Sequence, residues 1–78
     1  MFNLGEMRID IEKLDSKKSF EIKLQIALIN NAKRMMPYYE NKIDEFNKYI
    51  NERIMKIKEL LDIEHGDIYE NNKLIYSF

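Results

Sequence analysis

The stretch "SFEIKLQIALIN", residues 19–30, decides the fold because its apolar residues fit two different periods. As a β-strand, it alternates cleanly between an apolar side and a polar side. The apolar side would carry Phe20, Ile22, Leu24, Ile26 and Leu28. As a helix, the segment would be apolar on two nearly opposite faces, one with Phe20, Leu24, Ala27, Leu28 and Met35 and the other with Ile22, Ile26 and Ile29. Period alone favours the strand.

Length and composition favour the helix instead. The run from Ser16 to Met36 contains neither glycine nor proline, and it is far longer than the average strand of about 5 to 6 residues. The chain has twelve Ile but no Val and no Thr, so Ile is its default aliphatic residue and a poor indicator of β-structure. We therefore predict a helix over 16–35, capped by Asp15 or Ser16. A strand over 19–29, within a ββαββ arrangement, is the alternative.

A second, amphipathic helix is predicted over 37–63. Its apolar stripe recurs every three or four residues and consists of Tyr39, Ile43, Phe46, Ile50, Ile54, Ile57 and Leu61. Proline suits the first turn of a helix, but it disfavours helical torsions in the residue before it. We therefore predict a break at Met36–Pro37, and Gly66 is a natural stop after the helix.

Short strands are expected at both ends of the chain. Residues 67–77 have the pattern of a β-hairpin, with Asn71-Asn72 at a type I′ turn. Residues 7–12 alternate between apolar and charged side chains, and they can add a third strand to that hairpin. The predicted fold class is therefore α+β and dominated by helices, in a single small domain over 1–78.

Composition and motifs exclude several classes of function. Thirteen basic and fourteen acidic residues give a net charge of −1, which offers no overall field for nucleic acid. The chain has no cysteine and no apolar run near the 20 residues of a membrane span, so we expect a cytoplasmic protein of a cell or host cell with no membrane partner. His65 is the only histidine, and no glycine-rich loop or nucleophile motif accompanies it. We expect no enzyme activity, no cofactor and no metal site.

The leading functional hypothesis is a non-catalytic protein–protein interaction module, because a helix with two apolar faces needs cover on both sides. We expect a protein partner, a second copy or both, with a homodimer or higher oligomer. The candidate surface comprises Ile22, Ile26, Ile29, Met35, Met36, Tyr38 and Met55. The chain is rich in Ile, Lys and Asn, residues that AT-rich codons encode. This residue usage and the small size suggest an adaptor, inhibitor or regulator encoded by a mobile element such as a virus.

The alternative hypothesis is a nucleic-acid-binding regulator that uses the basic segment 17–34. Its candidate contacts are Lys17, Lys18, Lys33 and Arg34. Two of these residues precede Tyr38 at the predicted helix break, where cations and an aromatic ring can contact phosphates and stack on a base. This hypothesis predicts an affinity that falls steeply with salt.

Overall fold

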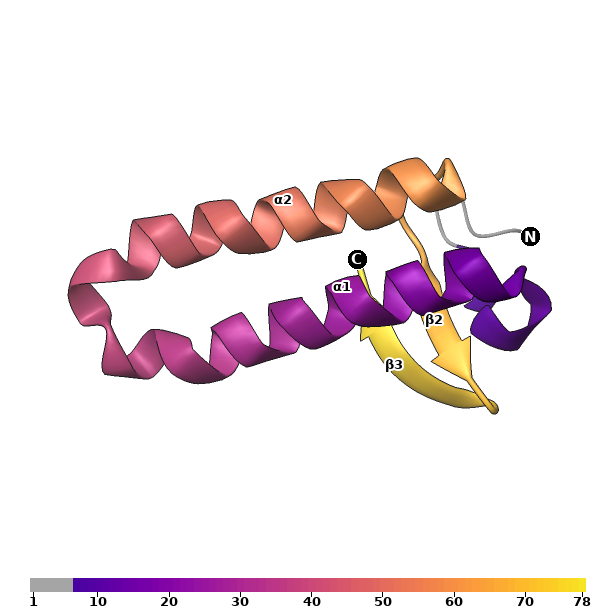
Figure 1. The fold of residues 1–78 in the computed structure, drawn as a ribbon, viewed down its shortest axis with the longest axis horizontal. Helices are drawn as coiled ribbons and strands as arrows, with labels where there is room; N and C mark the ends of the chain where they lie inside the picture. The colour runs from indigo at the N-terminus through magenta and orange to yellow at the C-terminus, as the bar shows by residue number, and fades with distance from the viewer. Residues whose placement is uncertain (1–6) are drawn as a thin grey trace, which may run out of the picture.

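Two antiparallel helices form a hairpin in the computed structural model, which describes residues 7–78 (Figure 1). Helix α1 spans Ser16–Met35, and helix α2 spans Ile43–Leu61. The hairpin packs against a three-stranded sheet of β1 (Arg8–Asp10), β2 (Asp67–Glu70) and β3 (Lys73–Ser77). The helix-dominated α+β prediction is therefore confirmed, and the alternative strand over 19–29 is wrong. The single-domain prediction includes residues 1–6, which lie outside the described residues.

Helix α1 begins where its cap predicts. The Asp15 side chain accepts a hydrogen bond from the backbone N–H of Lys18 at 2.8 Å. Such a cap satisfies one of the N–H groups that a first helical turn leaves without an intrahelical partner. This bond fixes the start of α1 just after the short 3₁₀ turn Ile11–Lys13.

The chain reverses between the helices over residues 36–42. Met36 keeps helical torsions, φ −48° and ψ −45°, so the prediction that Pro37 displaces it from helical geometry is wrong. Two short 3₁₀ turns, Met36–Tyr38 and Glu40–Lys42, make the connection. The reversal falls at Tyr39, with φ −133° and ψ 63°. Helix α2 therefore begins at Ile43 rather than at Pro37, because the intervening residues are needed to turn the chain.

Helix α2 ends before the glycine that was expected to stop it. Asp62 adopts the left-handed conformation with φ 55°, and the N–H of Ile63 donates to the carbonyl oxygen of Lys58 at 3.2 Å. This geometry ends a helix without glycine. Gly66 instead joins the sheet, where its N–H and carbonyl both hydrogen-bond to Phe78 at 3.0 Å. A Cβ on Gly66 would lie only 2.8 Å from Cδ1 of Ile9.

The sheet has the order β1-β2-β3 and unites the two ends of the described chain. Strands β1 and β2 are parallel, and parallel neighbours need a crossover connection, which the helical hairpin supplies. Strands β2 and β3 are antiparallel. They are joined by Asn71 and Asn72 with φ 53° and 65°, the positive values that a type I′ turn requires. The predicted C-terminal hairpin and N-terminal strand are both confirmed.

The core lies between the sheet and one side of the helical hairpin. Its buried residues are Ile11, Ile22, Ile26, Ile29, Ala32, Ile50, Ile57 and Ile68. They come from both helices, from β2 and from the turn before α1. The strands lie along one side of the hairpin, near the start of α1 and the end of α2 (Figure 1). The opposite side of the hairpin, which we call the outer face, is therefore left without a covering layer from residues 7–78.

Candidate interaction surface

Three of the residues predicted to form an interaction surface are part of the core. Ile22 and Ile29 are 0% exposed and Ile26 is 6% exposed, so a partner cannot reach them in the folded chain. Their assignment to the surface is corrected here. The physical reason is that α2 and the sheet together cover this side of α1, which leaves no room for a second molecule.

The other predicted surface residues differ in exposure. Tyr38 is 82% exposed and Met55 is 60% exposed, whereas Met35 is 38% exposed. Met36 is half-buried and packs against the core. Met55 lies two positions from the buried Ile57, on the solvent side of α2. These residues are scattered over the connection and both helices, so they do not form one patch.

A continuous apolar stripe instead runs along the outer face of α1. It consists of Phe20, Leu24, Leu28 and Met35, which we call the α1 stripe. Phe20 is 68% exposed, Leu24 is 41% exposed and Leu28 is half-buried. Their spacing of four, four and seven residues keeps all four on one side of a helix. The sequence shows this face, but only the structure shows that it is the uncovered one.

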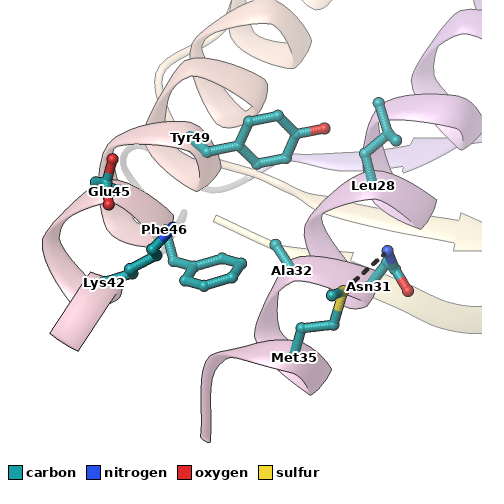
Figure 2. A pocket seen from close by; sticks show the side chains of 8 residues that line it. All are labelled: Leu28, Asn31, Ala32, Met35, Lys42, Glu45, Phe46 and Tyr49. Carbon is teal, nitrogen blue, oxygen red and sulfur yellow. Dashed lines mark hydrogen bonds between the residues drawn. The ribbon is translucent and has the colours of Figure 1, made fainter. Parts of the chain in front are cut away.

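A groove lies beside the α1 stripe, between the two helices. Its apolar walls are Leu28, Ala32 and Met35 from α1 and Phe46 and Tyr49 from α2. Figure 2 shows the side chains of Phe46 and Tyr49 reaching from α2 toward those of α1. The polar members of the lining are Asn31, Lys42 and Glu45. With a volume of about 340 Å³, the groove is at the small end of ligand pockets and can accommodate a few side chains of another molecule.

Two polar side chains inside the helical layer are incompletely paired. Gln25 is 3% exposed, and its Nε2 donates to Oε1 of Glu21 at 3.3 Å. Within residues 7–78, its Oε1 and the Nε of Arg53 have no hydrogen-bond partner. The Arg53 guanidinium lies 5.2 Å from the ring centre of Tyr49. An unpaired buried acceptor costs about 1 to 3 kcal/mol, so we expect Gln25 to lower the stability of the helical layer.

The basic residues of the alternative hypothesis are divided between the two ends of α1. Lys17 and Lys33 are sixteen positions apart, which is about 24 Å along a helix at 1.5 Å per residue. The Nζ of Lys33 lies 5.3 Å from the ring centre of Tyr76 in β3. Lys23, between the two ends, forms an ion pair with Glu70 at 2.8 Å. The described structure therefore does not bring Lys17, Lys18, Lys33 and Arg34 together into one patch.

The titratable side chains of residues 7–78 do not form a metal-binding cluster, because no group of three or more His, Asp or Glu side chains there is placed to hold a metal ion. His65 is exposed. Burial raises the pKa of the Tyr76 hydroxyl above its usual value of 10. Tyr76 packs against the core beside Phe78, so this shift follows from its structural position.

The geometry described above defines a small α+β protein with a helical hairpin on a three-stranded sheet. Comparisons of the chain with protein-family models, with curated proteins and with solved structures find no match. Neither helix of residues 7–78 is long and apolar enough to span a lipid bilayer.

Proposed function

We propose that the protein is a small, non-catalytic protein–protein interaction module that works through the outer face of its helical hairpin and self-associates. The observation that carries this proposal is the α1 stripe. The inner face of α1 is fully covered within the chain, yet its outer face still presents four large apolar side chains in one line. Apolar surface that is removed from water stabilises a complex by roughly 25 cal/mol per Å².

The composition of the surface supports the same proposal. Binding surfaces are enriched in aromatic residues and methionine, and the outer face offers Phe20, Met35 and Tyr49 beside the leucines. A regulator or inhibitor acts by this kind of contact and needs no reaction centre of its own. A cytoplasmic setting fits the absence of cysteine from the chain.

The nucleic-acid hypothesis has less support. Nucleic-acid binding depends on basic side chains that line up along a backbone, whereas two of the predicted contacts lie at each end of α1. Near the C-terminal pair, the Lys33 ammonium faces the Tyr76 ring and Arg34 donates to Oδ1 of Asn31 at 3.2 Å. We therefore place the working surface on the apolar outer face.

Photo-crosslinking tests the proposal directly. A benzophenone-bearing amino acid is placed at Leu24 on the outer face or, as a control, at Met55 on the solvent side of α2, which is more exposed than Leu24. Each variant is irradiated in cells that naturally produce the protein, and the adducts are separated by mass. We expect a discrete protein adduct from position 24 and none from position 55. No adduct from position 24, or the same adducts from both positions, would refute the proposed surface.

A further inference from the structure

The outer face of the hairpin has two grooves. The first is the groove beside the α1 stripe, and the second is lined by Lys17, Glu21, Lys56 and Leu60 among others. On α1, the grooves are lined by Lys17, Glu21, Leu28, Asn31 and Met35, among others. Together with Leu24 of the α1 stripe, these residues recur every three or four positions. On α2, the lining residues Glu45, Tyr49, Lys56 and Leu60 follow the same period. Each set therefore occupies one face of its helix.

The two ends of the α1 stripe, Phe20 and Met35, are both large apolar residues. It runs from Phe20 to Met35, so its midpoint lies between Ala27 and Leu28. When a second α1 is laid antiparallel across that midpoint, Phe20 meets Met35 of the second copy at both ends. Leu24 then lies opposite Asn31 of the second copy, and Leu28 lies opposite Ala27. Such a two-fold arrangement is isologous and closed, and the antiparallel helix dipoles attract each other.

The same two-fold axis pairs opposite charges on α2. Met35 lines one groove together with Glu45, and Lys17 lines the other together with Lys56 and Leu60. The midpoint of the α1 stripe therefore lies at the level of about residue 50 of α2. Glu45 and Lys56 lie on the outer face at equal distances from that point, about 8 Å along the helix axis at 1.5 Å per residue. The axis therefore places Glu45 of each copy opposite Lys56 of the other.

We propose that the outer face binds a second copy of this chain, with α1 antiparallel to α1 and with two Glu45–Lys56 ion pairs across the interface. This inference rests on the proposed function and gives its self-association a geometry. A second copy is favoured over other occupants because Glu45 and Lys56 on α2 complement each other about the level of the midpoint between Phe20 and Met35.

The size of the outer face indicates a weak, reversible dimer. A 20-residue helix is about 30 Å long, and two helices packed 8 to 10 Å apart form a face about 20 Å wide. Each copy would thus contribute about 600 Å², which gives a total near the lower end of stable interfaces. We expect a dissociation constant of about micromolar magnitude, so the dimer should form and dissociate over an accessible range of concentrations.

A charge-swap experiment on the full chain tests this geometry. The solution mass is measured by light scattering from about 1 to 500 µM for the wild type, Glu45→Lys, Lys56→Glu and the double swap. The 9.5 kDa chain should approach twice its mass with concentration. Each single swap places two like-charge pairs in the interface and should weaken the dimer about tenfold, and the double swap should restore the wild-type constant. Far-UV circular dichroism confirms that each variant is folded.

Two further variants separate the possible outcomes. Leu24→Asp should give a folded monomer at every concentration, and Met55→Asp should dimerise like the wild type. A double swap as weak as the single swaps would overturn the proposed pairing. A wild-type chain that stays monomeric, together with a crosslink from Leu24 to a different protein, would overturn self-association and leave the interaction surface intact. A monomer without any crosslink from Leu24 would refute both proposals.

Discussion

The two faces of α1 are both apolar, but only the inner face is buried within the chain. The inner face contributes Ile22, Ile26 and Ile29 to the core, whereas Phe20 and Leu24 on the outer face are 68% and 41% exposed. Hydrophobic content alone does not separate them, because both faces would release free energy if water were excluded. What separates them is the position of the sheet, which covers one side of the hairpin only.

The largest expected effect comes from placing the same charge on each face. Ile26→Asp buries an unpaired carboxylate in a small core, and we expect it to cost about 4 kcal/mol or more and to unfold much of the population. Leu24→Asp places the same group in solvent and should change the free energy of unfolding by less than about 0.5 kcal/mol at concentrations where the chain is monomeric. Chemical denaturation measures both variants. Equal losses of stability would show that the two faces are not distinct.

The next largest effect is expected at Gly66, where the sheet meets the helical hairpin. Gly66→Ala would place a Cβ 2.8 Å from Cδ1 of Ile9, 2.9 Å from Cδ1 of Ile63 and 3.2 Å from the carbonyl oxygen of Met7. We expect a loss of about 1 to 3 kcal/mol in thermal or chemical unfolding, because overpacking displaces neighbouring groups. Lys73→Ala, at an exposed position of β3, is the control and should be nearly neutral. A Gly66→Ala variant as stable as the wild type would mean that the neighbouring side chains can move and make room for the added Cβ.

A gain in stability is expected from the incompletely paired glutamine. Gln25→Met keeps the length of the side chain and removes the buried Oε1 that has no partner among residues 7–78. The hydrogen bond to Glu21 is lost as well, but that carboxylate is only half-buried and can be hydrated. We expect the free energy of unfolding to rise by about 1 kcal/mol. A decrease in chemical denaturation would indicate that Gln25 is satisfied in solution.

The smallest effect concerns pH. Burial raises the pKa of Tyr76 above its usual value of 10, so the folded chain retains this proton at a pH where the unfolded chain releases it. Stability from this group is therefore fully present below pH 10 and is lost as the pH rises through the folded-state pKa. The free energy of unfolding should fall between pH 10 and 11 in the wild type. In Tyr76→Phe the fall should be less steep, and an identical slope in both chains would contradict this assignment.

Much of the fold can be predicted from local patterns. Asp15 caps α1, the stripe with Ile50 and Ile57 defines α2, and the Asn71-Asn72 turn forms the C-terminal hairpin. The predicted start of α2 was wrong, because the residues after Pro37 form the turns that reverse the chain instead of the first turns of the helix. Local patterns predict the secondary structure that each segment prefers, but they do not predict how many residues are needed to connect two antiparallel helices.

The exposed face of α1 could not be predicted from the sequence of α1 alone. Periodicity shows that α1 has two apolar faces, yet which face is covered depends on where β2 and β3, more than thirty residues later in the chain, come to pack. The signal that could have favoured the correct face is residue type. Three isoleucines occupy the inner face, and longer or more flexible side chains such as Phe20 and Met35 occupy the outer one.

Hydroxyl-radical footprinting of the wild-type chain at low and high concentration is the most direct test of the central claim, that one face of α1 forms the core and the other forms a contact. The account predicts that Ile26 and Ile29 are protected at both concentrations and that Phe20 and Met35 react when the chain is dilute and become protected when it is concentrated. Met55 should react equally at both concentrations. Reactivity of Phe20 and Met35 that follows Met55 at every concentration would contradict the account.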